Sequence, residues 1–496
     1  MMLFFDDSST LGAALQRSAG RNPQKIAVFC GDRSITYKEL DRSSSLLAGW
    51  LLAQGLNPGD RVAIHWPNAI ETVQLFFAAA KAGLIAVPVN LRLKSAEIEY
   101  VLAHSGAVLC FIHPAMAAAL DAAARFGCPA RTALPDLSDE AVLLPAVSAD
   151  SHVLIMYTSG TTARPKGVLH TQQTMVASAS LSAQGLELVE DDSMLTALPM
   201  MHIAALCCAV IPSLLRGATV VLVPAFEPGA VLDAIQRFRC TILPLLPALM
   251  QFVIVEQERF PRDTSSLRLV ATGGDSTPLS TQQRACELFA APYQEIYALT
   301  EAVPLIISRK DQSRHGAIGQ ALTELRVVDL AGRDVPDGVT GELIARGPNN
   351  CIGYWNDPAA TAEVLRDGWL YSGDLAERDS DGYFSFRGRL KQIIIRAGSN
   401  ISPQEVEEVL YQHPAVLEAG VIGKPDPIYG ETVAAFVSLR PGAKADEAEL
   451  KEFARQRLAE YKTPETVIIL PELPKGLTGK VLRRGLKDLL SNASHA

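Results

Sequence analysis

Short apolar runs alternate with helical patterns along much of the chain, and this alternation constrains the fold more than any other feature. Residues 36–51 and 69–82 have helical patterns, and residues 61–64 and 85–89 are apolar runs typical of strands. The same order recurs at 218–223, 227–238 and 241–245. Such alternation predicts parallel sheets covered by helices, which is an α/β fold.

The pattern changes near residue 316. Strand-like runs at 326–329, 341–345 and 382–386 are separated by Gly, Pro and Asp turns, which predicts a β-rich subdomain over about 316–390. Helical patterns at 404–411 and 447–458 then flank strand-like runs at 415–422 and 432–439. A chain of 496 residues is too long for one core. We therefore expect an N-terminal domain over 1–390 and a small, mobile α+β C-terminal domain over 391–496.

Composition excludes several classes of protein. With 48% hydrophobic and 20% charged residues the chain is globular, and a net charge of −9 argues against a nucleic-acid partner.

The eight cysteines form no C-x-x-C pair, which indicates buried thiols in a reducing, cytoplasmic compartment. The apolar run at 197–215 contains Pro199, His202 and Pro212, so it predicts a strand, a loop and a buried helix and not a membrane span. The N-terminus lacks the basic region of a signal peptide.

A loop rich in glycine and small hydroxyl residues occupies 157–168 and follows a strand-like run at 153–156. Its backbone N–H groups, its hydroxyls and one ammonium can converge on phosphate oxygens. The residues concerned are Thr158, Ser159, Gly160, Thr161, Thr162 and Lys166. The loop differs from the common G-x-x-x-x-G-K-[ST] motif, because Pro165 precedes the lysine and Gly167 follows it. By composition alone, a flexible polar linker is the alternative.

Two further clusters follow strand-like runs. In one, Gly273 and Gly274 precede Asp275 and would let backbone approach a flat ligand, or form a tight turn. In the other, Tyr-Ala-Leu-Thr-Glu at 297–301, Tyr297 could stack on a base and Glu301 could hold Mg²⁺. The alternative for this second cluster is a strand edge with a solvated glutamate.

Two more candidates lie toward the C-terminus. Asp374 directly follows a glycine and could accept both hydroxyls of a ribose, although a lone aspartate in a turn would mean little. Lys480 precedes a helical pattern at 481–490 and could be a mobile cationic group or a solvated lysine of the tail.

Taken in order, these segments resemble the adenylate-forming superfamily of acyl-CoA synthetases, adenylation domains and luciferases. The resemblance covers nearly the whole chain. It rests on the phosphate loop, the Tyr-x-x-Thr-Glu segment, the Gly-Asp segment at 373–374, Gly-Arg-Leu-Lys at 388–391 and Gly-Lys at 479–480. Because all five segments match in the same order and spacing, a nucleotide site is favoured over a separate structural explanation for each segment.

The resemblance implies a role for each matching residue. The loop at 158–166 would wrap the β- and γ-phosphates of ATP. Tyr297 and the Gly273–Gly274–Asp275 segment would enclose the adenine, Thr300 would contact the α-phosphate, and Glu301 would bind Mg²⁺. Asp374 and Arg389 would hold the ribose. Lys480 would bridge the substrate carboxylate and the α-phosphate, where it could stabilise the transition state.

The resemblance also implies a second half-reaction with coenzyme A. The C-terminal domain would rotate on a hinge that maps to Lys391, and Gly398 would line the path of the pantetheine thiol. A surface lysine at a strand start is the alternative for Lys391.

Two positions bear on the acid substrate. The superfamily usually has glycine where this chain has Ala298, and one methyl group there would disfavour long linear acyl chains. His202 resembles the aromatic or histidine residue beside the acyl pocket, a buried core histidine being the alternative. Ile203 is not the aspartate of amino-acid-activating relatives. Together with Leu206, Val303 and Leu305 it predicts an apolar wall, which favours a medium-chain or aromatic acid.

We therefore predict an ATP-dependent acid–CoA ligase that uses ATP, Mg²⁺ and coenzyme A. An adenylation enzyme that loads a carrier-protein phosphopantetheine is the alternative within the enzyme class. A nucleotide sensor without turnover would need Lys480 or Glu301 to be missing, and both are present. The expected partners are small molecules, and the sequence leaves a homodimer open.

Overall fold

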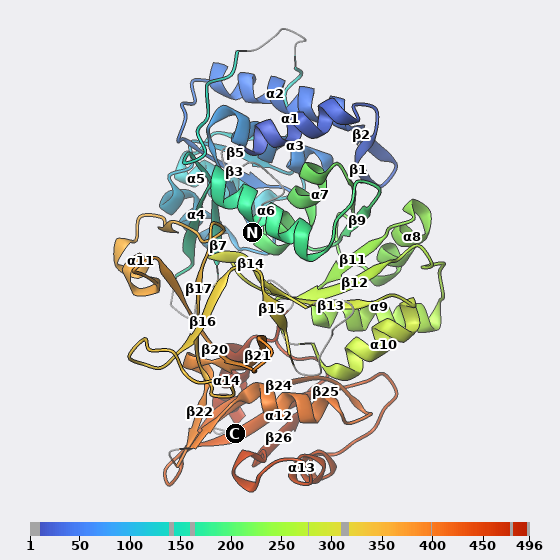
Figure 1. The fold of residues 1–496 in the computed structure, drawn as a ribbon, viewed down its shortest axis with the longest axis vertical. Coiled ribbons are helices and arrows are strands. Elements are labelled where there is room, and N and C mark those ends of the chain that lie inside the picture. Colours follow the sequence, from blue (N-terminus) through green and yellow to red (C-terminus); the bar gives the residue numbers. More distant parts are fainter. Residues whose placement is uncertain are drawn as a thin grey trace.

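The computed structural model describes residues 10–137, 143–158, 164–275, 277–308, 317–397, 399–476 and 480–493. Three sheets organise them (Figure 1). Two sheets form a large domain from α1 (Leu11–Arg21) to β21 (Tyr383–Arg389), and the third forms a small domain from β22 (Ile394–Arg396) to α14 (Arg483–Ala493). The turn η2 (Leu390–Gln392) lies between β21 and β22.

The first sheet of the large domain is mostly parallel, as the alternation predicted. Its order is β18, β8, β7, β4, β3, β5, β6, and only β8 and β18 run antiparallel to their neighbours. The strands are β3 (Arg61–His65), β4 (Ile85–Pro88), β5 (Leu109–Ile112), β6 (Ala130–Arg131), β7 (His152–Thr158), β8 (Lys166–Thr171) and β18 (Gly353–Tyr354).

Helices cover both faces of this sheet because its central strands are apolar on both sides. Ala63 faces α4 (Ser95–Ser105) and α5 (Ala117–Phe126), whereas its neighbours Val62 and Ile64 face the core under α2 (Tyr37–Ala53) and α3 (Ile70–Ala82). The helix α2 starts where predicted, because Thr36 and Glu39 cap its first turn reciprocally.

The second sheet joins a parallel half to an antiparallel half. The parallel strands are β1 (Ile26–Cys30), β10 (Thr219–Leu222), β9 (Ser193–Thr196), β11 (Ile242–Leu245), β12 (Leu269–Gly273) and β13 (Tyr293–Leu299). The hairpin partner β2 (Arg33–Thr36) closes that edge. Beyond β13 the strands are antiparallel and make up the β-rich part: β14 (Ala302–Ile307), β15 (Gly319–Ala321), β21, β20 (Trp369–Arg378), β17 (Gly341–Arg346), β16 (Glu324–Val328) and β19 (Leu365–Arg366).

One face of the parallel half packs against α8 (Pro228–Phe238), α9 (Pro247–Arg259) and α10 (Leu279–Phe289). The other packs against α6 (Gln172–Gly185) and the apolar run at 197–215. That run holds a loop, a π-helical turn η1 (Ala205–Val210) and α7 (Ile211–Arg216), whereas the predicted strand, β9, ends one residue before it. A short helix α11 (Pro358–Val364) lies beside β18 and β20. No helix in the described ranges is long and apolar enough to cross a membrane.

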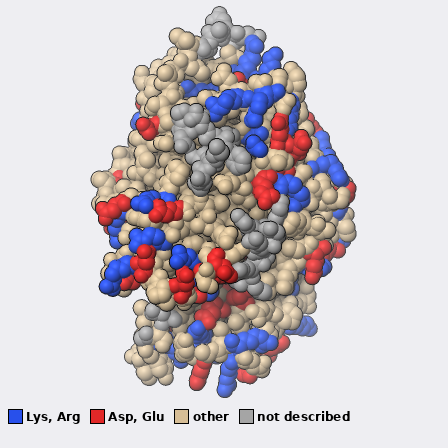
Figure 2. Space-filling model, viewed as in Figure 1, with Lys and Arg blue, Asp and Glu red and all other residues tan. Residues whose placement is uncertain are grey.

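The small domain is α+β, as expected. Its sheet has the order β23 (Ser399–Ile401), β22, β25 (Gly430–Leu439), β24 (Val416–Asp426), with β26 (Thr466–Ile469) beside β25. The helices α12 (Pro403–Tyr411) and α13 (Glu447–Arg455) pack on one face and α14 on the other. Figure 1 shows this domain below the large one, and Figure 2 shows acidic and basic side chains interspersed over the same side of the molecule.

Two predicted helix boundaries in the small domain are wrong. The helix α13 ends at Arg455 and not at 458. The helix α14 begins at Arg483 and not at 481, because Val481 pairs with Lys475 in a short antiparallel bridge. The eight cysteines are free thiols, and all but the half-buried Cys286 are buried.

Candidate active site

The predicted phosphate loop is the connection of a β-hairpin. The strand β7 enters it, β8 leaves it antiparallel, and Thr158 pairs with Lys166 across the two strands. This pairing brings the first and last polar residues of the loop side by side. Ser159, Gly160, Thr161 and Thr162 lie outside the described residues. The sequence indicated the strand before the loop, but not the strand after it.

Glu301, the predicted metal ligand, lies at the turn between β13 and β14. Its Oε1 accepts a hydrogen bond of 2.6 Å from the hydroxyl of Tyr354. Tyr354 lies on β18 beside β8, and Lys166 Nζ lies 4.9 Å from the centre of its ring. Tyr354 therefore links the carboxylate to the lysine of the phosphate loop. Sequence reasoning missed Tyr354, because only tertiary pairing brings β18 to this place.

A buried histidine supports the backbone next to Glu301. The Nε2 of His170 donates to the carbonyl oxygen of Thr300 at 2.9 Å. Burial lowers the pKa of His170 to about 4, so the ring is neutral at physiological pH. Its Nδ1 lies 3.2 Å from the hydroxyl of Thr174 on α6. The sequence contained no signal for this support.

The residues present fit one Mg²⁺ ion at Glu301. Mg²⁺ in nucleotide sites keeps several waters and is held by one or two carboxylates together with substrate phosphates. Glu301 supplies a half-buried carboxylate that Tyr354 already orients. Within the described ranges no three His, Cys, Asp or Glu side chains cluster as ligands. An ion at Glu301 would accordingly complete its shell with phosphate oxygens and water.

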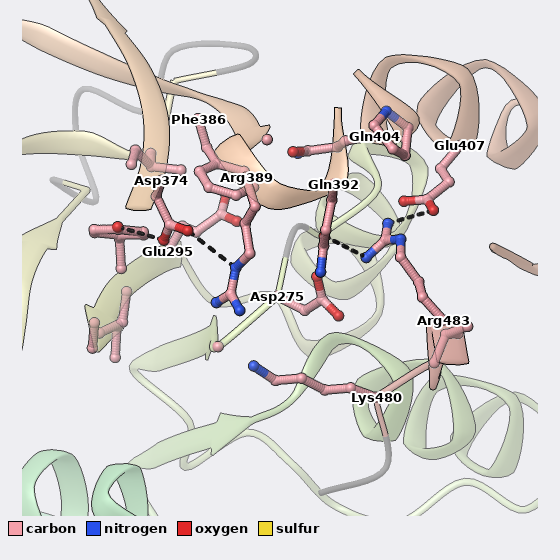
Figure 3. Close-up of a pocket in the computed structure, with 18 residues that line it drawn as sticks. Asp275, Glu295, Asp374, Phe386, Arg389, Gln392, Gln404, Glu407, Lys480 and Arg483 are labelled. Carbon is pink, nitrogen blue, oxygen red and sulfur yellow. Dashed lines mark hydrogen bonds and ion pairs between the residues drawn. The ribbon is translucent and has the colours of Figure 1, made fainter. Parts of the chain in front are cut away.

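Two glycines shape the wall of a pocket between the domains. A side chain at Gly273 would collide with the backbone oxygen of Ile296 on the neighbouring strand. Gly274 has a φ of +85°, a backbone conformation that residues other than glycine rarely adopt. The pocket that Gly274 lines also contains Tyr297, Asp374 and Lys480 (Figure 3). The structure thus brings together predicted residues from four distant segments.

Tyr297, Asp374 and Arg389 form a connected group in this pocket. The hydroxyl of Tyr297 donates to Asp374 Oδ2 at 2.7 Å, and Arg389 Nε lies 3.0 Å from Asp374 Oδ1. Asp374 and Arg389 face each other across β20 and β21, which fixes their spacing. Burial raises the pKa of Asp374, and Arg389 and the tyrosine bond oppose the rise. The carboxylate of Asp374 is thereby held in a fixed position, and the positive charge of Arg389 compensates its negative charge.

Lys480 reaches the same pocket from the small domain. Its backbone oxygen accepts from Gly476 N at 2.7 Å, and Leu482 N donates to Pro474 O at the same distance. This pairing orients the side chain toward Gly274, so Lys480 is not a free tail lysine in this structure (Figure 3). Burial lowers the pKa of Lys480, while Asp275 and Asp374 oppose that change. Lys480 is therefore one of the cations that the small domain contributes to this pocket.

Among the predicted acyl-side residues, Ala298 lines the pocket between the domains, whereas His202, Ile203 and Val303 do not. Burial lowers the pKa of His202 to about 4, with the charges of Lys480 and Arg92 adding to the effect. A neutral ring follows, and its Nε2 lies 3.5 Å from Asn90 Nδ2. Ile203 and Val303 are buried in the main core with Leu206, and Ala298 packs against that core while lining the pocket. Leu305, expected in the same wall, instead packs in the core of the β-rich part.

The predicted hinge residue, Lys391, does not line the pocket. Lys391 is exposed on η2, and the neighbouring Gln392 lines the pocket in its place. Gly398 lies outside the described residues.

Two further groups that line the pocket were not predicted from the sequence. Glu295 is 8% exposed, and burial raises the pKa of its carboxyl to about 8, with Glu408 and Asp275 adding to the rise. The second group is an ion pair of 2.6 Å between Arg483 and Glu407 (Figure 3). Neither has a local motif, because burial and the approach of the two domains create both environments.

Comparison with known proteins agrees with this arrangement. The profile of the AMP-binding enzymes matches residues 15–355, and that of the AMP-binding enzyme C-terminal domain matches residues 405–480. A feruloyl-CoA synthase of Amycolatopsis sp is 40% identical over 95% of this chain and 97% of its own. An indoleacetate–CoA ligase of Aromatoleum aromaticum is 35% identical over 96% and 97%.

Among solved structures, an anthranilate CoA ligase in complex with anthranoyl-AMP superimposes with a TM-score of 0.93, 27% identity and coverage of 99% of both chains. The fold and the pocket define a two-domain, nucleotide-using enzyme. The chain belongs to the AMP-binding enzyme family, and within it is an acid–thiol ligase.

Proposed function

We propose that the protein is an ATP-dependent acid–CoA ligase that works in two steps. In the first, a carboxylate oxygen attacks the α-phosphorus of ATP, the bond from that phosphorus to the bridging oxygen breaks, and pyrophosphate leaves. In the second, the thiol sulfur of coenzyme A attacks the acyl carbonyl carbon, the bond to AMP breaks, and the thiol proton is released. The acyl thioester and AMP are the products.

The single observation that carries this proposal is the meeting of Lys480 with the Tyr297–Asp374–Arg389 group in one pocket. Asp374 would accept the ribose hydroxyls, and Tyr297 with Gly274 would enclose the adenine. Lys480 would then lie at the α-phosphate and the attacking carboxylate. A cation at that point stabilises charge that develops in the transition state, which is the main task in nucleotidyl transfer.

The phosphate side would be served by the hairpin loop and by Glu301. Lys166 and Thr158 flank that loop, and Glu301 would hold Mg²⁺ against the phosphates. The ion would neutralise charge on the leaving pyrophosphate. Tyr354 would keep the carboxylate pointing at the ion.

The second step requires the thiol to reach the acyl carbonyl, while Lys480 and its domain close over the pocket in this structure. We propose that the small domain reorients about η2, where Lys391 is exposed and free of the pocket lining. Gly398 would then border the path of the thiol. Two half-reactions would thus use two arrangements of one fold.

The acid is proposed to be hydrophobic, either medium-chain or aromatic. Ile203 and Val303 are buried in the apolar core and the methyl group of Ala298 lies at the pocket, while Asn90 is a polar neighbour of His202. Relatives named for ferulate and indoleacetate support an aromatic acid.

The test is acid-dependent AMP release by the purified protein with ATP and Mg²⁺, with and without coenzyme A, across aryl, fatty, short-chain and dicarboxylic acids. Mass spectrometry identifies the thioester. AMP release that does not depend on any acid would overturn the adenylation step. Thioester formation on a phosphopantetheinylated carrier protein, but not on coenzyme A, would overturn the proposed acceptor.

A further inference from the structure

A side chain of the small domain caps a helix of the large domain. The backbone N–H of Leu279, the first residue of α10, donates to Glu408 Oε1 on α12 at 3.1 Å. This hydrogen bond joins residues 129 positions apart in the chain. It crosses the same cleft that holds the nucleotide pocket, because Glu408 also lines a cavity that continues past Glu295.

The helix needs this contact, because its own cap cannot supply one. The residue before α10 is Pro278, whose side chain has no acceptor. The carbonyl oxygen of Pro278 accepts from Thr281 N and Gln282 N, and the Leu279 N–H donates to Glu408 Oε1. A carboxylate at a helix N-terminus is favoured both by the open N–H group and by the helix dipole. Glu408 therefore replaces the missing local cap from the other domain.

The same helix α12 is tied to the segment that carries Lys480. Glu407, next to Glu408, pairs with Arg483 at 2.6 Å and accepts from Val421 N at 2.8 Å. Arg483 lies three residues after Lys480. Contacts thus run from α10 to Glu408 and from the adjacent Glu407 to Arg483. Figure 3 shows the Glu407–Arg483 pair and Lys480 in the same pocket.

Glu408 lies among ionisable groups of both domains. In the large domain, burial raises the pKa of Glu295 to about 8, and the charges of Glu408 and Asp275 add to the rise. The charge of Asp275 also acts on Lys480 and Arg483. On α12 itself Glu407 is compensated by Arg483, and Glu405 is paired with Lys462 at 2.6 Å.

We propose that Glu408 is a clasp residue: by capping α10 it holds the small domain in the orientation that keeps Lys480 in the nucleotide pocket. It is a positioning residue, because it lies outside the lining of the pocket that contains Tyr297 and Asp374. This inference rests on the proposed two-step function, and it assigns the clasp to the adenylate-forming step alone. The cap is lost whenever the small domain turns away, so it opposes that turn.

The experiment measures each half-reaction separately in Glu408→Ala and Glu408→Gln. Glu408→Ala is expected to slow acid-dependent AMP formation about tenfold, as the loss of a charged helix cap would. Thioester formation from supplied acyl-adenylate and coenzyme A is expected to stay at the wild-type rate or to rise. Glu408→Gln keeps an acceptor oxygen and should recover part of the first rate.

The matched control is Glu405→Gln, which lies on the same helix and loses only an ion pair within the small domain. It should leave both half-reactions unchanged. Hydrogen exchange provides a readout apart from activity: the peptide at the start of α10 should exchange faster in Glu408→Ala and not in Glu405→Gln.

Equal losses in both half-reactions, or unchanged exchange at α10, would overturn the clasp. Neither result would contradict the proposed function. That function would be contradicted if the wild-type protein formed no acid-dependent AMP. If Glu408→Ala does not fold, Glu408→Gln provides the test. A ratio of adenylate formation to thioester formation equal to that of the wild type would then contradict the proposal.

Discussion

Replacing Tyr354 with phenylalanine isolates one hydrogen bond at the proposed metal site. The hydroxyl of Tyr354 lies 2.6 Å from Glu301 Oε1, while its ring lies 4.9 Å from Lys166 Nζ. Tyr354→Phe removes the hydroxyl and keeps an aromatic ring beside the lysine. Any effect on the metal can therefore be assigned to the orientation of Glu301.

The size of the effect follows from the geometry and from exposure. A hydrogen bond to a charged group contributes about 1.5–3 kcal/mol when it is shielded from water. Glu301 and Tyr354 are both half-buried, so water replaces part of the lost bond. We therefore expect a loss of about 1 kcal/mol, which corresponds to an about fivefold higher Mg²⁺ concentration for half-maximal activity.

The assay is a Mg²⁺ titration of acid-dependent AMP formation at saturating ATP and acid, with Mn²⁺ as a second ion. Isothermal titration of the ion into the protein with a non-hydrolysable ATP analogue gives a readout without turnover. Tyr100→Phe is the control, because its hydroxyl donates to Pro165 O at 3.1 Å and not to Glu301. An unchanged Mg²⁺ requirement in Tyr354→Phe would refute the idea that this hydroxyl orients a metal ligand.

Three further predictions concern other residues. Lys480→Ala should reduce adenylate formation by about 10²–10³-fold and spare thioester formation from supplied acyl-adenylate; equal loss in both would contradict its role. Ala298→Gly should extend the range of acids toward longer chains, measured as kcat/KM across a fatty-acid series, and an unchanged profile would show that the methyl group does not limit the pocket. Glu295→Gln should stabilise the protein at pH 8 more than at pH 5 in urea unfolding. In the folded protein the pKa of Glu295 is about 8, whereas in the unfolded chain it is about 4.5. Between these pH values the unfolded chain loses the proton that the folded protein keeps, so the free energy of unfolding of the wild type falls as pH rises. A gain that is the same at both pH values would be inconsistent with a neutral buried carboxyl.

Local sequence predicted the layers of the fold well. The runs at 61–64, 85–89 and 241–245 are strands, and the helix after Thr36 begins at its capping box. These elements follow from apolar periodicity and from hydrogen bonds between neighbours in the chain, which a sequence displays directly. The two-domain α/β architecture is confirmed by the structure and its relatives.

Prediction failed where pairing partners are distant. The strand at 166–171 was missed because glycine and proline dominate its start, and it exists through pairing with β7 and β18. The start of α14 was placed two residues early, because the bridge between Lys475 and Val481 overrides local helical preference there. That bridge also orients the Lys480 segment.

The sequence by itself indicated the chemical groups of the proposed nucleotide site: a hydroxyl- and glycine-rich loop, a tyrosine, three acidic groups and a lysine near the C-terminus, each recognisable from its immediate neighbours. The tertiary structure decided their relations. Pairing of β20 with β21 sets Asp374 against Arg389, and β18 brings Tyr354 to Glu301. The position of the small domain places the half-buried Lys480 in the pocket and joins Glu408 to α10. Such contacts depend on the packing of segments far apart in the chain and on the exclusion of water between them, and neither is encoded in any local pattern.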